Sequence, residues 1–227
     1  MNTVLSYIEA GHKDGAKLLA GGKRLRPAFC VWGYVAAVGP DAPVEHVLDA
    51  AASLELLHAS ALAHDDLMDA SDTRRGHPSA HRAFEQQHRE SGWPGSSEDY
   101  GAAGAILLGD LCLVWAEQML RRSGVGQHAL ARVWPRYDDM RTELAIGQFA
   151  DLVNSSHTLP TLEEVLDVLR RKSGNYTVRR PLEIGAAMAG CDDAVVDALS
   201  GYGAAIGEAF QLRDDILGVF GTPSLTG

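Results

Sequence analysis

Apolar residues recur at helical spacing along almost the whole chain, and no segment alternates in the way that a half-buried β-strand does. Thr161 and Glu164 form a capping-box signal, and Asp192 stands where it can cap the last helix. No repeat or long linker divides the chain, so the pattern predicts an all-α fold with a single domain over residues 1–227. The predicted helices cover residues 3–19, 24–38, 44–69, 78–90, 98–123, 126–153, 161–172, 176–189 and 193–219.

Composition narrows the classes of function. The 227 residues are 46% hydrophobic, enough for a sizeable core, and the formal net charge is −10. Such a chain is a poor partner for nucleic acid, because neutralising phosphates needs clustered Lys and Arg. The uncharged apolar stretches 28–38 and 102–109 fall short of the roughly 18 residues that a membrane span needs, and the N-terminus lacks a signal peptide's apolar run. We expect a cytoplasmic protein without a membrane span, with Cys30, Cys112 and Cys191 as reduced core residues.

Three acidic residues gather near the end of the helix predicted over 44–69. Asp65 and Asp69 lie one turn apart on one face, with Asp66 next to the first, and like charges so placed destabilise a helix unless cations pair with them. The segment 48–62 before them is apolar nearly all round and is expected to be buried, where charges need partners or metals. The pattern favours Mg²⁺, which takes oxygen ligands. The alternative is a solvated helix end.

A second acidic pair, Asp214 and Asp215, lies near the end of the helix predicted over 193–219. Gln148 and Asp151 stand three residues apart on another helix, so they share a face. Acidic clusters at the ends of two buried helices predict a cavity in which metal ions bridge opposite walls. Asp151 alone is explained equally well as a metal ligand or as an ordinary helix-end charge.

Basic residues stand in three short groups. These groups are Lys23 with Arg26, Arg74 with Arg75, and Lys172 with Ser173. The first opens a helix, whose N-terminus itself favours phosphate, and arginine makes forked contacts with phosphate oxygens. Any one group is more often an exposed charged patch. Together with two acidic clusters they predict a metal-bridged diphosphate pocket beside a second, metal-free phosphate site.

At these residues the sequence resembles the trans-isoprenyl diphosphate synthases, the polyprenyl synthetase family. The matching motifs lie at residues 21–27, 56–78, 147–152, 172–177 and 210–221. The resemblance implies an all-α helical bundle of the isoprenoid synthase type around a deep central cavity. It also implies a homodimer with three Mg²⁺ ions that joins isopentenyl diphosphate to an allylic diphosphate.

The resemblance implies a role for each matching residue. The diphosphate of isopentenyl diphosphate would be held by Lys23, Arg26, His58 and Arg75. Mg²⁺ would be ligated by Asp65, Asp69 and Asp214, with Asp66, Asp151 and Asp215 close by, and we count Asp151 among the metal residues. The allylic substrate would be contacted by Arg74 and Lys172 at its diphosphate, and by Gln211 and the segment Lys172–Ser173 at its developing cation.

The residues before the first acidic cluster bear on product length. Ala61 and Ser60, four and five residues before Asp65, are small, where relatives that stop at fifteen carbons have bulky aromatics. The tail would then run down the helix at least to Leu57, about 12 Å below Asp65. We expect geranylgeranyl diphosphate, with farnesyl or longer polyprenyl diphosphates as alternatives. The small residues can instead serve close helix packing.

The sequence departs from the family pattern in two places. Gly218 stands where the second acidic motif usually has a third Asp, which weakens one metal site. The chain also stops at Gly227, where relatives continue with several helices, so we expect the ends to be missing or removed.

Three other classes remain open. A class I terpene cyclase shares the first acidic motif, but its second metal motif is lacking here. A di-iron bundle would use the Glu-x-x-His pairs at 55–58 and 85–88 with Glu117 and Glu143, although we expect Glu85 and His88 to be exposed. An inactive subunit of a heteromeric prenyltransferase would carry a defect at Gly218 or beyond the end of the sequence.

Overall fold

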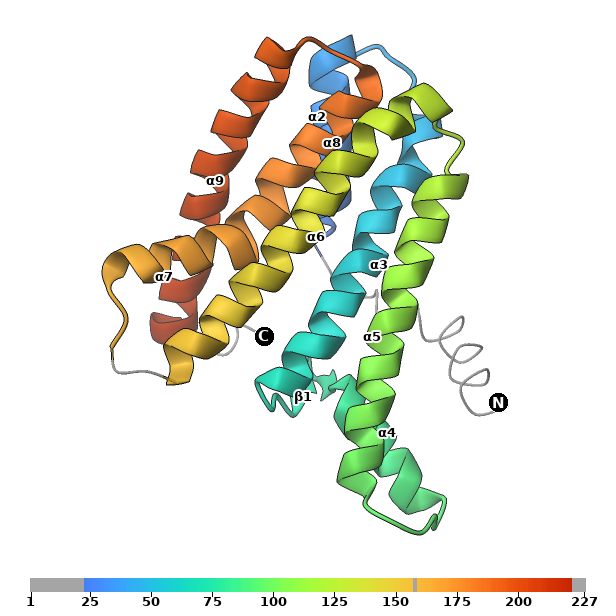
Figure 1. Ribbon diagram of the computed structural model, residues 1–227, viewed down its shortest axis with the longest axis vertical. Coiled ribbons are helices and arrows are strands. Elements are labelled where there is room, and N and C mark those ends of the chain that lie inside the picture. The colour runs from blue at the N-terminus through green and yellow to red at the C-terminus, as the bar shows by residue number, and fades with distance from the viewer. Residues whose placement is uncertain (1–22, 157–158, 222–227) are drawn as a thin grey trace. The chain divides into compact units, whose positions relative to one another are not determined.

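A computed structural model describes residues 23–156 and 159–221, and the helix predicted over 3–19 lies outside them. The described chain is helical almost throughout (Figure 1). Its elements are α2 (Leu25–Val38), α3 (Glu45–Met68), β1 (Thr73–Arg74), β2 (His77–Pro78), α4 (Ala80–Glu90), α5 (Ser97–Arg122), α6 (Gln127–Ser156), α7 (Leu162–Val168), η1 (Leu169–Arg179), α8 (Arg180–Ala189) and α9 (Asp193–Phe220).

The helix boundaries agree closely with the predicted ones, from α2 through α6 and again in α9. The capping box is confirmed, because Thr161 Oγ1 accepts from the Glu164 N–H at 3.3 Å and Glu164 Oε2 accepts from the Thr161 N–H at 2.7 Å. Asp192 stands at the N-cap of α9 as predicted, but its side chain makes no capping hydrogen bond there. Local signals therefore placed these helix starts correctly even where the cap itself is not used.

The predicted break between the helices over 161–172 and 176–189 is wrong. The chain stays helical from Leu162 to Ala189, and the middle of this stretch is η1, an 11-residue π-helix. Gly174 and Asn175 are turn formers by propensity, but both are buried in η1. Because η1 packs against α2, α6 and α9, tertiary packing outweighs the local preference.

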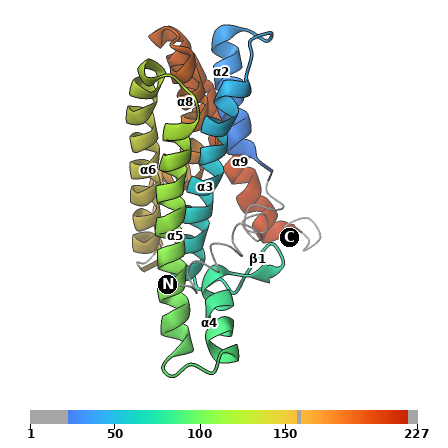
Figure 2. The same cartoon turned by 90° about the vertical axis from the view of Figure 1, so that its right-hand side faces the viewer.

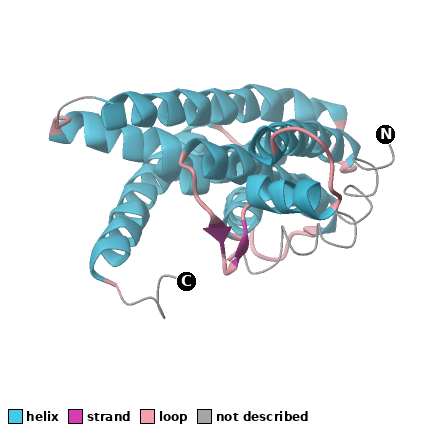
Figure 3. Ribbon diagram, turned by 90° about the horizontal axis from the view of Figure 1, so that it is seen from below, coloured by secondary structure: helices cyan, strands magenta, loops and turns pink. Residues whose placement is uncertain are grey.

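A short β-hairpin follows α3 and was not predicted. β1 and β2 pair antiparallel with Arg74 opposite His77 (Figure 3). The two residues between them, Arg75 and Gly76, have φ of 53° and 78°, as a two-residue type I′ turn requires. The strands are too short to show alternation in the sequence, so only the turn could have revealed them.

Tertiary contacts divide the chain into two compact units. The described part of the first unit comprises residues 23–24 and 53–118. In this unit α3 and α5 run side by side, and α4 packs against the first turns of α5 (Figure 2). The described part of the second comprises residues 25–52, 119–156 and 159–221. That the chain folds as a single domain stays a prediction.

In the second unit α8 is the central helix. It packs against α2, α6 and α9, and residues 181–188 are all buried. Gly185 allows the close approach to α2, because a Cβ there would lie 1.9 Å from the Cys30 carbonyl oxygen. Apart from Glu183, residues 181–189 are apolar on every face of α8, as expected of a helix that is covered all round.

All three cysteines are free thiols. Burial raises the pKa of Cys30 to about 12 and that of Cys112 to about 11, whereas Cys191 is half-buried. The expectation of core thiols is thus confirmed for the first two.

Among the described helices, α5 is the one whose length and composition would allow it to cross a membrane. The uncharged stretch 102–109 is too short for a membrane span, and acidic residues such as Asp110 interrupt the longer apolar run of α5. Apolar helices of this length also occur in the cores of soluble proteins. Asp110 on α5 lies 3.7 Å from His64 Nε2 of α3, so this helix also carries polar contacts inside the first unit.

Candidate active site

The last turn of α3 presents the first acidic cluster. The Asp69 N–H donates to the Asp65 carbonyl at 2.8 Å, so the helical turn continues past Met68 and stacks the two side chains one above the other. Asp69 is exposed and the Asp65 side chain is 23% exposed, whereas Asp66 is 3% exposed. Asp65 and Asp69 are therefore the pair that a solvent-borne ligand can reach.

Asp66 is bound by an arginine of the hairpin. Arg74 Nε donates to Asp66 Oδ1 at 2.9 Å, and a terminal guanidinium nitrogen contacts the same oxygen. That nitrogen lies 3.5 Å from Asp65 Oδ2. The hydrogen bond with Asp66 raises the pKa of Arg74 in spite of its partial burial. Asp66 is thus the hydrogen-bond partner of Arg74, and this contact holds the guanidinium directly beside Asp65.

The first unit contains three other predicted phosphate ligands, Lys23, His58 and Arg75. Arg75 is exposed at the hairpin turn, and Lys23 is exposed. His58 is half-buried seven residues before Asp65, which places it on nearly the same face of α3. Arg24, which lies between Lys23 and Arg26 in the sequence, was not among the predicted site residues. A terminal nitrogen of its guanidinium lies 2.5 Å from Glu55 Oε2 of α3.

In the second unit, η1 brings the predicted lysine to α6. Lys172 Nζ lies 2.8 Å from Asp151 Oδ2, and Ser173 beside it is half-buried. Gln148, one turn before Asp151, has a buried Nε2 without a hydrogen-bond partner in the part of the chain that the structure describes. An unsatisfied amide donor beside a Lys–Asp pair suits an anionic ligand that accepts hydrogen bonds.

The second acidic cluster lies on α9. Gln211 Nε2 donates to Asp215 Oδ1 at 2.7 Å, four residues along the helix. Asp214 is half-buried and Asp215 is exposed. Gly218 faces open space, since a Cβ there would meet nothing within 4 Å. The missing third Asp of the motif is thus not excluded by packing.

Arg26 contacts η1 through its guanidinium. A terminal nitrogen donates to Thr177 Oγ1 at 3.1 Å, and the group lies 4.3 Å from the centre of the Tyr176 ring. Arg26 Nε is buried and has no hydrogen-bond partner among the described residues. The predicted phosphate ligand is therefore held in place by η1 while one donor remains unused.

The donor set fits Mg²⁺ better than a metal held by protein alone. Within residues 23–156 and 159–221, no group of three or more His, Cys, Asp and Glu side chains is arranged to hold a metal ion. Mg²⁺ is usually bound by one or two carboxylates together with substrate phosphates and water. Asp65 and Asp69 provide such a pair of oxygen ligands.

The di-iron alternative is not supported. Three of its four carboxylates are engaged by arginines: Glu55 by Arg24, Glu85 by Arg82 and Arg89, and Glu143 by Arg180. The expectation that Glu85 and His88 are exposed is wrong, because they are 7% and 6% exposed. They are buried where α4 packs beside α5, and His88 contacts the Trp93 and Tyr100 rings.

The described fold is helical almost throughout, with two carboxylates one turn apart at the end of α3, an arginine beside them, and a lysine beside Asp151 of α6. The family model "Polyprenyl synthetase" matches residues 13–227. The chain belongs to the polyprenyl synthetase family, whose members are isoprenyl diphosphate synthases.

Known relatives support this assignment. A geranylgeranyl pyrophosphate synthase structure from Corynebacterium glutamicum, complexed with isoprenyl diphosphate and magnesium, is 44% identical, with a TM-score of 0.89 over 100% of this chain and 68% of that chain. A short chain isoprenyl diphosphate synthase of Methanocaldococcus jannaschii is 34% identical over 92% of this chain and 58% of its own length. A (2E,6E)-farnesyl diphosphate synthase of Mycobacterium bovis is 36% identical over 91% of this chain and 51% of its own length. The chain thus spans little more than half the length of these curated relatives.

Proposed function

We propose that this protein is a Mg²⁺-dependent trans-prenyltransferase that condenses isopentenyl diphosphate with an allylic diphosphate. The observation that carries the proposal is the accessible pair Asp65 and Asp69, with Arg74 held beside it by the buried Asp66. Two carboxylates stacked on one helical face repel each other, which favours the binding of a divalent cation, and the nearby arginine offers a forked contact for phosphate. Family membership supplies the reaction class.

The residues of the first unit act on the allylic diphosphate. Asp65 and Asp69 would hold Mg²⁺, which when bound would supply positive charge to the departing diphosphate. Arg74 contributes a fixed positive charge to the same group. The allylic carbon–oxygen bond breaks with its electron pair on diphosphate, and the double bond of isopentenyl diphosphate then forms the new carbon–carbon bond. A proton passes from the new product to the released diphosphate.

The second unit contributes the remaining proposed ligands. In this unit Asp214 and Asp151 would be the Mg²⁺ ligands, for an enzyme that we propose to bind three Mg²⁺ ions; Asp215 lies next to Asp214, and Lys172 would contact the allylic diphosphate. Gln211 and Ser173 face the developing cation with their polar groups. The hydrogen bond from Gln211 to Asp215 and the contact of Lys172 with Asp151 support these roles, because each side chain is already held in one direction.

The diphosphate of isopentenyl diphosphate is bound by Lys23, Arg26, His58 and Arg75. Arg26 supports this part of the proposal through its buried, unused Nε donor. A cation whose guanidinium is fixed by Thr177 and Tyr176 loses less side-chain freedom when it binds phosphate. No metal ion is needed at this substrate.

The product that we propose is geranylgeranyl diphosphate. Leu57 and Ser60 are buried on α3 and Ala61 is half-buried, which supports the proposal that a tail runs back from Asp65 along this covered part of the helix. The small side chains of Ser60 and Ala61 leave room for that tail. Relatives named as geranylgeranyl and as farnesyl synthases are both found, so the product must be measured.

We further propose a cytoplasmic homodimer. Ile106, Leu107 and Val114 of α5 are large apolar side chains that are about half exposed, and a second copy would cover such a face. The free, buried Cys30 and Cys112 suit a reducing compartment. Sedimentation at micromolar concentration should give twice the monomer mass, and Val114→Lys should shift the protein toward the monomer.

Product analysis tests the proposed reaction. The protein is incubated with isopentenyl diphosphate, Mg²⁺ and, in separate reactions, dimethylallyl, geranyl or farnesyl diphosphate, and the products are measured by mass. A twenty-carbon diphosphate should accumulate from every primer. A product that stops at fifteen carbons would support a farnesyl synthase, and the absence of any elongated product in all three reactions would contradict the proposed reaction.

A further inference from the structure

The helical segment that contains Lys172 and Ser173 has an unusual winding. η1 closes its turns between residues five apart, over 11 residues, whereas such turns normally occur singly inside α-helices and often at functional sites. Something in the surrounding structure must therefore hold the wide turns open. The end of η1 at Arg179 and Arg180 shows what does so.

The backbone of Arg180 closes the last wide turn. Its N–H donates to the carbonyl of Asn175, five residues earlier. The next residue, Pro181, has no N–H, and its ring would crowd the carbonyl of Thr177 four residues before it if the chain wound as a regular α-helix. The sequence Arg180-Pro181 thus favours a wide turn at this position.

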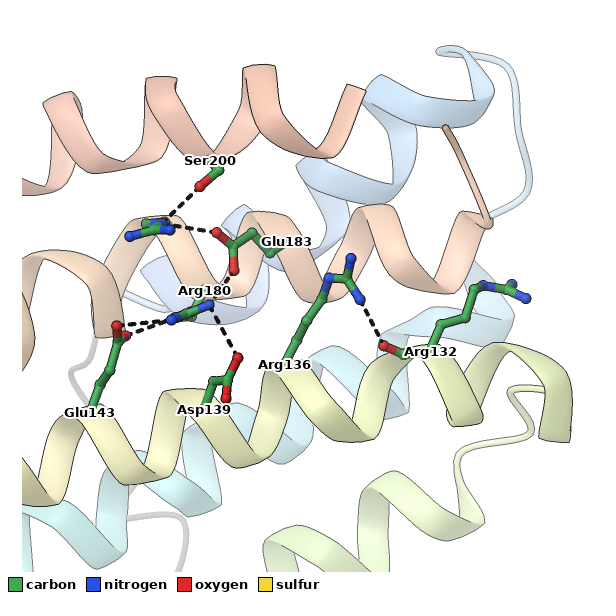
Figure 4. A network of polar contacts seen from close by, with 8 residues as sticks. Arg132, Arg136, Asp139, Glu143, Arg180, Glu183 and Ser200 are labelled. Carbon is green, nitrogen blue, oxygen red and sulfur yellow. Dashed lines mark hydrogen bonds and ion pairs between the residues drawn. The ribbon is translucent and has the colours of Figure 1, made fainter. Parts of the chain in front are cut away.

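The side chain of Arg180 ties this turn to α6 (Figure 4). Its Nε and a terminal nitrogen each donate to a different oxygen of Glu143 at 2.8 Å, and the other terminal nitrogen donates to Glu183 Oε2 at 2.8 Å. The Arg180 side chain is 13% exposed, so these charge-assisted bonds are largely shielded from water. Arg179 joins the same network, because its Nε donates to Glu183 Oε1 at 2.9 Å and to Ser200 Oγ at 2.8 Å.

α6 connects the clamped end of η1 to Lys172. Glu143, Gly147 and Asp151 occupy successive turns of one face of α6. Gly147 allows the backbones of α6 and η1 to approach closely, since a Cβ there would lie 2.6 Å from the backbone nitrogen of Lys172. One turn further along α6, Asp151 pairs with the Lys172 ammonium group. The register between α6 and η1 is therefore fixed at both ends of the segment, by Arg180 and by Lys172.

We infer that Arg180 is a positioning residue, which locks the register of η1 through Glu143 and thereby directs Lys172 toward Asp151. Without the two hydrogen bonds from Arg180 to Glu143, a wide turn of η1 can relax to an α-helical turn. This change shifts the register of η1 against α6 by one residue, so that Lys172 turns by about 100° relative to α6. The inference rests on the proposed function only for what Lys172 binds. The geometry of η1 itself is independent of it.

The main test variant replaces both partners, Glu143→Met with Arg180→Met. Exchanging a buried ion pair for apolar side chains of similar volume is often neutral or stabilising, and Glu183 keeps its hydrogen bond from Arg179, so this variant should fold; its melting temperature is measured beside that of wild type. Arg180→Lys keeps the charge but removes the fork. Asp138→Asn is the control, because it breaks a solvent-exposed ion pair with Arg141 on the same helix.

Hydrogen exchange is measured first, on the protein without substrates. The double Met variant should exchange faster than wild type over residues 169–179, while α5 residues 97–118 in the first unit should be unchanged. Steady-state kinetics follow. The kcat/KM for the allylic substrate should fall by at least about 100-fold, because a displacement of about 1 Å already produces such a loss, and Arg180→Lys should recover part of it. Because Arg26 contacts η1, the KM for isopentenyl diphosphate should rise by a smaller factor.

The outcomes separate the inference from the proposed function. If wild type forms no prenyl diphosphate, the proposed function fails, and hydrogen exchange alone decides the role of Arg180. The inference would be overturned if the backbone amides of residues 169–179 exchanged at the same rate in the double Met variant as in wild type and Asp138→Asn. It would also be overturned if the double Met variant kept full kcat/KM for the allylic substrate, or if activity fell only in proportion to a lower melting temperature.

Discussion

The substitution Asp66→Asn tests whether this carboxylate serves Arg74 or a metal ion. Asp66 is 3% exposed and accepts two contacts from the guanidinium, one of them at 2.9 Å. Loss of hydrogen bonds to a charged group costs about 1.5–3 kcal/mol. The lower end, about 1.5 kcal/mol, is expected here, because Asn still accepts one bond and Arg74 is 40% exposed to water. For a chain of this size that energy lowers Tm by about 3–6 °C.

The assay combines thermal unfolding with metal binding. Tm is measured by circular dichroism for wild type, Asp66→Asn and the control Asp72→Asn, which breaks an exposed pair with Arg82 and should cost less than about 0.5 kcal/mol. Mn²⁺, used as a probe for Mg²⁺, is then titrated in the presence of inorganic diphosphate. Asp66→Asn should bind it nearly as tightly as wild type, whereas Asp65→Asn should bind it weakly. An unchanged Tm together with weak metal binding in Asp66→Asn would refute the assignment to Arg74.

Further predictions concern the product, the substrates and the thiols. Ser60→Phe or Ala61→Phe should shorten the product by at least one five-carbon unit, because overpacking blocks the tail; an unchanged mass contradicts a tail along α3. Arg26→Ala should chiefly raise the KM for isopentenyl diphosphate and Lys172→Ala that for the allylic substrate, each by about 10- to 150-fold. Equal effects on both substrates would argue against two phosphate sites. The Cys30 thiol, with a pKa raised to about 12 by burial, should react with a disulfide reagent at pH 7 only as fast as the protein opens, and immediate reaction would contradict its burial.

The network around Glu183 predicts a pH dependence of stability. Burial alone raises the pKa of Glu183, but hydrogen bonds from Ser200 and Arg180 and the charges of both arginines lower it overall. Because the pKa is lower in the folded than in the unfolded protein, the stabilisation is complete above about pH 4.3 and is lost as the pH falls further. Glu183→Gln should therefore reduce the slope of ΔG against pH in this acidic range. A slope equal to that of wild type would show that Glu183 does not take part in acid unfolding.

Most of the helical fold could be predicted because its signals are local. Apolar spacing and glycine breaks placed α2 to α6 and α9, and Thr161 with Glu164 marked the start of α7. η1 was missed for a physical reason. Its winding depends on Pro181 and on an ion pair between Arg180 and Glu143, 37 residues apart, which no local pattern reveals.

The candidate site was predictable to the same degree. The spacing of Asp65 and Asp69 is a local property of a helix, so their shared face followed from the sequence. The assignment of Asp66 to Arg74 did not, since it depends on a hairpin whose strands are two residues long. Gly76, a residue type that adopts positive φ readily, was the available sequence signal for that hairpin.

The measurement that tests the central claim most directly is the stoichiometry of the reaction. Consumption of isopentenyl diphosphate and release of inorganic diphosphate are followed together, with an allylic diphosphate and Mg²⁺ present. We predict that one diphosphate is released for each isopentenyl diphosphate consumed, and that Mg²⁺ removal or the double substitution Asp65→Ala with Asp69→Ala stops both at unchanged helical content. Release of diphosphate from the allylic substrate without consumption of isopentenyl diphosphate would contradict the account and indicate a cyclase.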